Sequence, residues 1–477
     1  MIKNFKWLVL VSLTFVACSS NDEAVTDPNS TDGEPLTSGS ADLSKYVALG
    51  DSFAAGFSDN ALFIDGQKNS YPNIIATQFA LVGGGDFTNP FMADNIGGFS
   101  NGGAQIPQFG PRLYLAPGNI PTPVSGTSTT EITVKLTGQF SNMGVPGAKA
   151  TQLDLLGFGS ALGNPYFARF ASSPAATVVD DAIAQNPTFF SLWIGGNDVL
   201  GYATSGGISS NPITPVAAFN TAYNSLITKL TTGGRKGVIA NLPYVSSLPY
   251  FKTVPYNPVP LNAATAAQLN SGFLAYNNGL LFAQSNGLLT AAEVARRTIT
   301  FSASATNRVV IVDEYLTNLS GFGIPSYRQA TNEDLIVLPA RSFIGTTVGG
   351  NPAQVNGVSV PLADNWVLSK NEIEEIRIAT DAYNVTIEAA ASSNNLALFD
   401  AKTVMTSLST TGIVQNGYTM TSTYVTGNSF SLDGVHPSPK GYALIANKFL
   451  EAINATYGSN FKGVNLGQYQ ILYPSSL

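Results

Sequence analysis

The chain has 477 residues, of which 44% are hydrophobic and only 11% are charged, so it can bury a large core. Its net charge of −7 and the lack of any Lys/Arg cluster argue against a nucleic-acid-binding surface. A single cysteine and a single histidine exclude an intramolecular disulfide, a cysteine-based metal site and a multi-histidine zinc site. Any chemistry that needs an imidazole must therefore use His436.

The first 17 residues have the pattern of a signal peptide. Lys3 and Lys6 precede an apolar run that is too short to span a membrane as a mature helix. The run ends at Phe15-Val16-Ala17-Cys18, which resembles a bacterial lipobox, although Phe15 stands where Leu is more usual. We therefore expect a lipidated Cys18 that anchors the protein in the bacterial cell envelope, with the outer membrane as the expected site and the face left open. An ordinary signal peptide with an incidental cysteine is the alternative.

Residues 18–44 are acidic and rich in Ser, Thr, Gly and Pro, which predicts a flexible tether. We expect one folded domain to begin at Lys45 and to extend to residue 477. Its first element is a buried strand over Tyr46–Leu49, and Tyr71–Val82 has the apolar spacing of a helix.

Further strands and helices alternate along the rest of the domain. Apolar runs predict strands over 188–194, 237–242, 308–312 and 396–399, and helices with capping residues begin near 173, 214, 369 and 438. This alternation predicts an α/β protein with a central parallel sheet and helices on both of its faces.

Four long, mostly turn-rich stretches interrupt this pattern and are predicted insertions: 86–139, 246–307, 321–366 and 403–431. The first includes one expected strand near 131–136, and the second is partly helical around 263–277. Turn-rich segments of this length usually lie over a functional edge of a domain.

The sequence around Ser52 allows two interpretations. Gly50-Asp51-Ser52 directly follows the first strand, and a segment with helical character begins there. In open α/β sheets ligands bind beyond the carboxyl ends of the strands, so Ser52 is placed to be a nucleophile. Serine at the start of a helix is also a common N-cap, which is the structural alternative.

The only histidine lies in Asp433-Gly434-Val435-His436-Pro437, just before the last predicted helix. A carboxylate three residues earlier can bind one ring nitrogen and fix the tautomer, which leaves the other nitrogen free to accept a proton. A purely structural Asp–His pair is the alternative.

Together these segments resemble the GDSL/SGNH hydrolase family. Gly50-Asp51-Ser52, Asn142-x-Gly144-x-x-Gly147, Gly195-Gly196-Asn197-Asp198 and Asp433-x-x-His436 occur in the order of the four sequence blocks of that family. The resemblance implies a three-layer α/β/α sandwich of the flavodoxin-like type, with large loop insertions. Phe53 departs from the pattern, because Leu usually follows the serine.

The resemblance also implies a serine ester hydrolase that acts through an acyl-enzyme intermediate without metal or cofactor. Ser52 would be the nucleophile, His436 the base and Asp433 its orienting carboxylate. The oxyanion would be held by the backbone N–H groups of Ser52 and Gly147 and by the side-chain amide of Asn197. Gly144 is the alternative to Gly147, and a turn residue is the structural alternative for Asn197.

The nature of the substrate stays open at this level. The expected partners are a small-molecule, lipid or polysaccharide ester and, through the lipid anchor, a membrane; we expect a monomer. A polysaccharide O-deacetylase of the same fold and a non-catalytic, glycan-binding surface lipoprotein are the alternatives.

Overall fold

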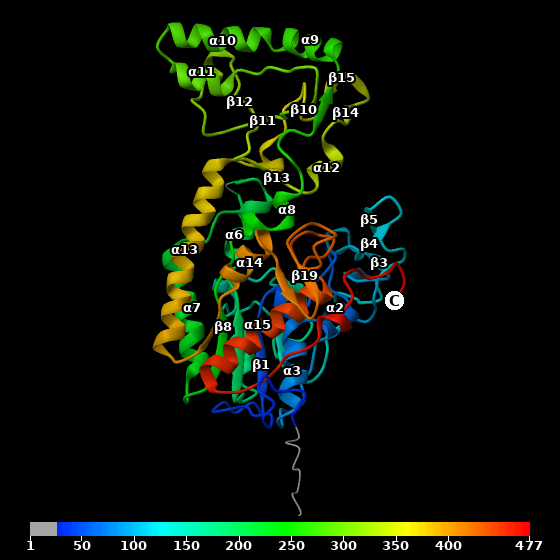
Figure 1. Cartoon of the computed structure of the whole chain (residues 1–477), viewed down its shortest axis with the longest axis vertical. Helices are drawn as coiled ribbons and strands as arrows, with labels where there is room; N and C mark the ends of the chain where they lie inside the picture. Colours follow the sequence, from blue (N-terminus) through cyan, green and yellow to red (C-terminus); the bar gives the residue numbers. More distant parts are fainter. Residues whose placement is uncertain (1–25, 209) are drawn as a thin grey trace, which may run out of the picture.

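The computed structural model describes residues 26–208 and 210–477, and its centre is a five-stranded parallel sheet (Figure 1). The strands lie in the order β17-β8-β7-β1-β6. In chain order they are β1 (Tyr46–Gly50), β6 (Asn142–Gly144), β7 (Phe189–Trp193), β8 (Lys236–Ala240) and β17 (Ala397–Phe399). Counted along the chain, this is the order 2-1-3-4-5 of flavodoxin-like sheets. The predicted α/β fold with a central parallel sheet is confirmed.

Helices cover both faces of the sheet, which completes the three predicted layers. On one face, α15 (Pro439–Tyr457) packs against α3 (Tyr71–Ala80) and β17. On the other face, α7 (Val216–Thr231) packs against α5 (Val178–Ile183) and against α13 (Lys370–Ser393), the long helix that runs along one side of Figure 1. Every residue of β1 and β7 is buried, as expected for parallel strands that are covered on both faces.

The last helix illustrates how local signals set the boundaries of an element. The Ser438 hydroxyl accepts a hydrogen bond from the N–H of Gly441, and Pro439 occupies the first helical position. Gly458 ends the helix in the left-handed conformation, with φ of 71°. The helix predicted to begin near 438 is thereby confirmed, and it extends to Tyr457.

The second and third insertions build a lobe above the carboxyl ends of the strands, at the top of Figure 1. Three helices form its outer edge: α9 (Ala263–Gly272), α10 (Leu274–Ser285) and α11 (Ala291–Arg297). A small separate core that includes Leu280 and Val294 lies beneath them. Short antiparallel strands complete the lobe: β9 (Val259–Leu261), β10 (Ser304–Asn307), β11 (Val310–Val312), β12 (Tyr327–Gln329), β14 (Thr347–Val348) and β15 (Asn351–Val355).

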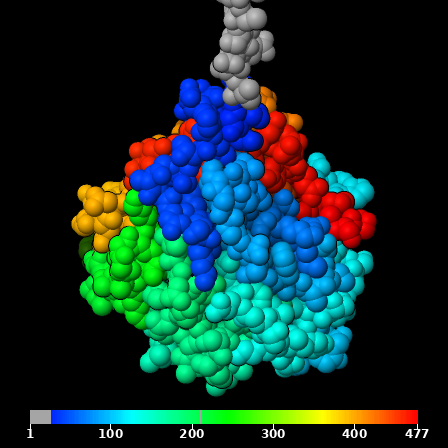
Figure 2. Space-filling model, turned by 90° about the horizontal axis from the view of Figure 1, so that it is seen from below, coloured from blue at the N-terminus to red at the C-terminus, as the bar shows by residue number. Residues whose placement is uncertain are grey.

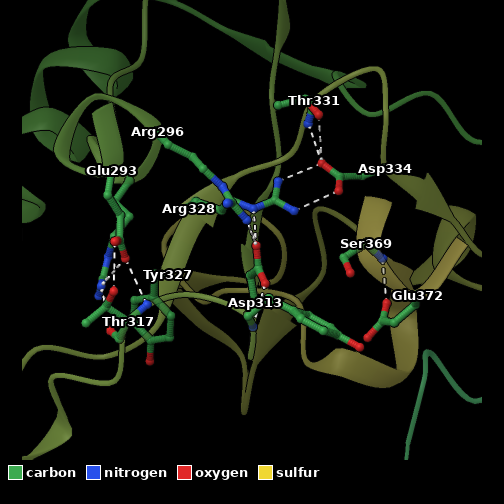
Figure 3. Close-up of polar contacts among 12 residues, drawn as sticks. Glu293, Arg296, Asp313, Thr317, Tyr327, Arg328, Thr331, Asp334, Ser369 and Glu372 are labelled. Carbon is green, nitrogen blue, oxygen red and sulfur yellow. Dashed lines mark hydrogen bonds and ion pairs between the residues drawn. The ribbon is translucent and has the colours of Figure 1, made fainter. Parts of the chain in front are cut away.

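A buried arginine holds the base of this lobe together (Figure 3). The Arg328 guanidinium lies between the carboxylates of Asp313, at 2.5 Å, and Asp334, at 2.6 Å, and all three side chains are almost fully buried. Nearby, the N–H of Ser369 donates to Glu372 Oε2 at 2.6 Å and begins α13, as the predicted capping box requires. Because a buried ion loses solvation unless it is paired, removing one partner here would destabilise the lobe strongly.

Part of the predicted tether is packed on the domain. Residues 26–44 lie against the C-terminal segment: the N–H of Thr31 donates to the carbonyl oxygen of Asn460 at 2.9 Å, and the side chains of Ala41 and Leu43 are buried in the main core. Figure 2 shows this N-terminal segment beside the C-terminal residues on the lower face. The polar composition of the segment gave no indication of these few anchoring residues. Positions 18–25 of the predicted tether lie outside the described residues.

Three other local expectations differ from the structure. The stretch 131–136 forms no strand, and the first insertion instead contains a hairpin of β4 (Leu113–Ala116) and β5 (Ile120–Pro123). The segment 148–156 has a sequence of helical character but forms only a 3-10 turn, Ala150–Gln152. The strand expected over 308–312 pairs antiparallel with β12 in the lobe, outside the central sheet. These elements are short, so their partners decided their conformation more than their own sequences did.

The remaining elements are short connections. They are the helices α1 (Ser52–Ala55), α2 (Ile64–Lys68), α4 (Pro165–Ala168), α6 (Asn197–Thr204), α8 (Pro249–Lys252), α12 (Ala340–Phe343) and α14 (Ala401–Ser409), and the strands β2 (Ser100–Asn101), β3 (Ala104–Gln105), β13 (Leu335–Ile336), β16 (Val367–Leu368), β18 (Ile413–Gln415) and β19 (Tyr418–Met420). None of the described helices is both long enough and apolar enough to cross a bilayer.

Candidate active site

Ser52 lies at the carboxyl end of β1, which is flanked by β7 and by the edge strand β6, as its position in the sequence predicts. It is the first residue of α1, and the N-cap is Asp51, whose Oδ1 accepts from the N–H of Phe53 at 3.0 Å. The capping role considered for Ser52 therefore belongs to its neighbour. Gly50 makes the turn possible, because a Cβ there would lie 2.6 Å from the carbonyl oxygen of Trp193.

The predicted serine, histidine and aspartate form a continuous chain of hydrogen bonds. Ser52 Oγ lies 2.8 Å from His436 Nε2, and His436 Nδ1 lies 2.9 Å from Asp433 Oδ2. Ser52 is separated from the other two residues by about the whole length of the domain sequence, so only the fold brings them together. A nucleophile, a base and an orienting carboxylate within hydrogen-bond reach are the arrangement that activates a hydroxyl group.

The carboxylate of Asp433 accepts four hydrogen bonds. Oδ1 accepts from the N–H groups of Val435 and His436, each at 2.8 Å, and Oδ2 accepts from His436 Nδ1 and from the N–H of Asn60 at 2.9 Å. Burial by itself would raise the pKa of Asp433, but the charge of His436 and these hydrogen bonds lower the pKa to about 2. Asp433 is therefore ionised at neutral pH and held in one orientation.

Aromatic side chains surround the imidazole. The ring centroid of His436 lies 4.6 Å from that of Phe57 and 5.5 Å from that of Phe53. Tyr442, on α15, donates a hydrogen bond at 2.7 Å to the carbonyl oxygen of Phe57 and so fixes the backbone of that residue. The Phe at position 53 thus packs beside the base and also against Trp193 at the end of β7.

Two backbone amides near Ser52 are free to bind a substrate. Within the described residues, neither the N–H of Ser52 nor that of Gly147 donates a hydrogen bond. The N–H of Gly144 is already used, since it donates to Asn142 Oδ1 at 3.0 Å, and a Cβ on Gly144 would lie 2.3 Å from the N atom of Ala55. Gly144 is therefore a packing position, and the geometry favours Gly147 as the donor.

The backbone conformation at position 147 favours glycine. Gly147 has φ of +79°, which L side chains rarely adopt, whereas a Cβ built there meets no protein atom within 4 Å. Asn197 lies beside it at the start of α6, where its Nδ2 donates to the carbonyl oxygen of Ala148 at 3.0 Å. An amide group has two N–H donors, so one hydrogen of Asn197 is left for a ligand.

Two further buried carboxylates support the loops around the site. Asp51 caps α1, and Asp198 Oδ2 accepts from the N–H of Ala150 at 2.8 Å, just beyond Gly147. Burial raises the pKa of Asp51 to about 6 and raises that of Asp198, while the Phe53 and Ala150 amides act in the opposite direction. Both carboxylates therefore hold backbone amides of the loops around the site.

Sequence reasoning missed the segment that follows α1. Asp59 and Asn60 both have positive φ, at 51° and 67°, which directs the Asn60 N–H to Asp433. Asp59 is buried, and its Oδ1 accepts from the N–H of Leu432 at 2.8 Å. An Asp-Asn pair tolerates the left-handed conformation, so it indicates a turn, but nothing in the sequence places that turn against residue 433.

The other predicted site residue, Cys18, lies outside the described residues. Within residues 26–208 and 210–477, no group of three or more His, Cys, Asp or Glu side chains is arranged to hold a metal ion.

Comparison with known protein families finds a similarity in the second half of the chain. Residues 294–449 match the model of the GDSL-like Lipase/Acylhydrolase family, a segment that includes Asp433 and His436 but not Ser52. No curated protein sequence matches the chain.

Several solved structures are similar to the chain at low identity. An acetylxylan esterase from Geobacillus stearothermophilus is 11% identical, with 87% of this chain and 95% of that chain covered and a TM-score of 0.35. The α/β hydrolase LAE5 from the metagenome of Lake Arreo, Spain, is 10% identical, with coverage of 87% and 97% and a TM-score of 0.35. An extracellular lipase from Streptomyces rimosus is 12% identical, with coverage of 86% and 98% and a TM-score of 0.30. The family match over residues 294–449 shows that this segment is similar to GDSL-like lipases and acylhydrolases.

Proposed function

We propose that this protein is a serine ester hydrolase that acts through an acyl-enzyme intermediate formed on Ser52. The observation that carries the proposal is the uninterrupted hydrogen-bond chain from Ser52 Oγ through His436 to Asp433, with contacts of 2.8 and 2.9 Å. The similarity of residues 294–449 to the model of a lipase/acylhydrolase family supports the same class of reaction. A carboxylic ester is the substrate class that such a nucleophile attacks.

Each step uses a group already in place. Ser52 Oγ attacks the ester carbonyl carbon and passes its proton to His436 Nε2. The tetrahedral intermediate collapses, and His436 gives the proton to the leaving alcohol oxygen. Water then attacks the acyl-enzyme, again losing a proton to Nε2, and the acid leaves as that proton returns to Ser52. Throughout, Asp433 accepts from Nδ1, keeps the tautomer with Nε2 free and stabilises the imidazolium.

The negative oxygen of the tetrahedral intermediate would be held by three donors: the N–H of Ser52, the N–H of Gly147 and Nδ2 of Asn197. Both amides are without other partners in the described part of the chain, and Asn197 is fixed beside Gly147 through Ala148. A preorganised donor of this kind typically contributes about 10²–10³ in rate. Because Ser52 begins a helix of only four residues, these individual donors, rather than a helix dipole, are expected to stabilise the charge.

Hydrolysis of p-nitrophenyl acetate and butyrate by the purified full chain tests the proposal. We expect turnover by the wild type and loss of at least about 10⁴-fold in kcat for Ser52→Ala. An exposed serine serves as the matched control, and Ser342→Ala should retain wild-type turnover. Equal turnover by wild type and Ser52→Ala, or none by either, would overturn the assignment.

Kinetics with a set of esters identify the acyl and alcohol parts of the substrate. A chain-length series from acetate to long-chain acyl esters, run beside acetylated xylan, separates a lipase-like enzyme from a polysaccharide O-deacetylase. A glycan-binding module without activity would bind the polysaccharide and leave every ester intact.

We also propose that the chain is a lipoprotein of the bacterial envelope, anchored through Cys18. The signal-peptide pattern supports this proposal. The fold supports it too, because residues 26–44 lie at the amino ends of the strands, whereas Ser52 follows a carboxyl end (Figure 1). An anchor at the amino ends would leave the site open. Membrane fractionation of the wild type and of Cys18→Ala tests this. A variant that stays membrane-bound would contradict the lipid anchor.

A further inference from the structure

All four insertions contribute to one cavity beside the loop that contains Asp433 and His436. The cavity has a volume of about 800 Å³ and is open to solvent. We call it the insertion groove. Its walls come from Asn119 at the tip of the β4–β5 hairpin, from residues 252–255 and 258 at the end of α8 and just beyond it, from Arg341 and Ile344 at α12, and from residues 422–426 after β19. These elements face one another across the middle of Figure 1.

Three of the walls are hydrogen-bonded directly to the active-site loops, and the α12 wall is connected to them through Tyr250. The hairpin is attached where the N–H of Leu113 donates to the carbonyl oxygen of Asp59 at 2.8 Å. The N–H of Tyr250, on α8, donates to the carbonyl oxygen of Gly434 at 2.9 Å, and the carbonyl oxygen of Tyr250 accepts from Leu338 N–H, just before α12. The fourth wall is attached through Tyr424, whose hydroxyl donates to the carbonyl oxygen of Leu432 at 2.5 Å.

Close packing reinforces one of these attachments. Gly434 has φ of +73°, and a Cβ there would lie 3.0 Å from the N atom of Tyr250 and from Leu338 Cδ2. The loop between Asp433 and His436 is therefore pressed against the base of the groove. A ligand in the groove would lie next to the residues that we propose to activate Ser52.

The fourth wall also holds an unusual backbone conformation. Val425 has φ of +66°, which is a true outlier for a β-branched residue. The surrounding turn fixes it, since Thr421 N–H donates to the carbonyl oxygen of Gly427 at 2.7 Å and Gly427 N–H donates to that of Thr423 at 2.8 Å. Strain of this kind persists only where neighbouring contacts enforce it, and it is common at ligand-binding segments.

The charge of the groove is opposite to that of the whole protein. The chain carries a net charge of −7, yet the lining contains Lys252 and Arg341 and no Asp or Glu. Both side chains are exposed, and in the described part of the chain no carboxylate oxygen lies within 4.0 Å of their charged nitrogens. Arginine binds carboxylates with two parallel hydrogen bonds, so this groove is suited to an anionic ligand.

The rest of the lining is suited to a sugar. Hydroxyl groups of Thr253, Ser422, Thr423 and Thr426 and the amide of Asn119 offer hydrogen bonds, while Tyr424 and two prolines offer flat apolar surface. The volume falls within the range of about 300–1,000 Å³ that holds drug-sized ligands, which corresponds to a short oligosaccharide rather than a single acetate group.

From these observations we infer that the insertion groove binds the alcohol part of the ester, and that this part is an oligosaccharide bearing a carboxylate. The inference rests on the proposed esterase function and adds the class of substrate to it. Lys252 and Arg341 would pair with the carboxylate of a uronic acid unit, and the hydroxyl-rich wall would bind its neighbours. The acyl group would lie outside the groove, at Ser52.

The test compares two acetylated xylotetraoses that differ only in one glucuronate substituent. We expect the full-length wild type to have a kcat/KM about tenfold higher for the charged ester. This preference should decline with added salt, because the two ion pairs are exposed and are screened by salt. The double variant Lys252→Gln/Arg341→Gln should lose the preference and hydrolyse p-nitrophenyl acetate as the wild type does. Lys45→Gln, an exposed cation at the amino end of β1, is the matched control and should keep it.

A binding measurement separates the two proposals. Calorimetric titration of Ser52→Ala with the same tetraoses without acetyl groups should show tighter binding of the charged one, lost in the double variant. Serine-dependent turnover of p-nitrophenyl acetate without any charge preference in kinetics or binding would overturn the groove assignment alone. Equal turnover by wild type and Ser52→Ala would overturn the esterase proposal. If the double variant instead loses binding to vesicles of anionic phospholipid and not to the sugar, the ligand is a lipid headgroup and the inference is wrong.

Discussion

Replacing Asp433 by Asn tests the proposed chemistry most directly, because it removes one charge and keeps the shape of the side chain. In the wild type, all four atoms that contact the carboxylate are N–H donors: three backbone amides and His436 Nδ1. An asparagine must point its own NH2 group at some of these donors. If NH2 replaces Oδ1, it meets the two amides of Val435 and His436; if it replaces Oδ2, it meets the amide of Asn60 and the imidazole.

The second orientation is the less costly one, because the imidazole can respond and the backbone cannot. By moving its proton to Nε2, His436 turns Nδ1 into an acceptor for the new NH2 group, so only the Asn60 amide loses its partner. That tautomer presents a donor to Ser52 and cannot accept its proton. Inverting the tautomer and removing the charge typically lowers kcat about 10⁴-fold, which corresponds to about 5 kcal/mol in the activation barrier.

The assay is steady-state hydrolysis of p-nitrophenyl acetate at neutral pH, with the Tm measured alongside to show that the variant is folded. We expect kcat to fall by about four orders of magnitude with little change in KM. Asp86→Asn, at an exposed carboxylate, is the control and should behave as the wild type. Retention of kcat within tenfold by a folded Asp433→Asn would refute the role that we assign to the carboxylate.

Three further predictions concern residues around the site and the lobe. Gly147→Ala should lower kcat by about 10²–10³, because a positive φ is unfavourable for alanine and the backbone amide would move. The open space around the new Cβ should limit the loss in Tm. An unchanged kcat would exclude the Gly147 amide as an oxyanion donor. Gly144→Ala should instead lower the free energy of unfolding by about 1–3 kcal/mol in a denaturant titration, since its Cβ would meet the backbone of Ala55, and an unchanged midpoint would argue against this packing. Burial raises the pKa of Glu372 to about 8; the Ser369 amide opposes this shift and the charge of Asp364 adds to it. The folded state therefore binds the Glu372 proton more tightly than the unfolded state does. The free energy of unfolding should decline as pH rises from about 4.5 to 8. Glu372→Gln should flatten that decline in Tm measured against pH, and an identical slope in both proteins would contradict it.

The strongly periodic elements were predictable from the sequence alone. β1, β7 and β8 are mostly apolar, and α7, α13 and α15 each have one apolar face, so their patterns indicated their secondary structure. The alternation of these elements was sufficient for the parallel sheet. Short elements were not predictable, because β6, at the edge of the sheet, has three residues and its pairing with β1 decided its conformation.

The sequence also determined which residue types are present for catalysis. With one histidine in the chain, His436 had to be the base if an imidazole is used, and the order of the four motifs indicated its partners. What tertiary structure decided is how these residues are held: Asp51 caps α1 in place of Ser52, and Asn60 supplies a hydrogen bond to Asp433 across more than 370 positions. Backbone contacts between distant segments leave no pattern in a single sequence.

The four insertions show most clearly which features followed from the sequence and which from the tertiary structure. Their turn-rich composition indicated that they lie near a functional edge, but not that all four meet in one groove or that Lys252 and Arg341 share it. Where a loop goes depends on the few hydrogen bonds that attach it to the core, such as Tyr424 to Leu432, and not on its own periodicity. Local propensity and hydrophobic pattern therefore determined the scaffold of this protein, and contacts between remote segments determined the shape and charge of its site.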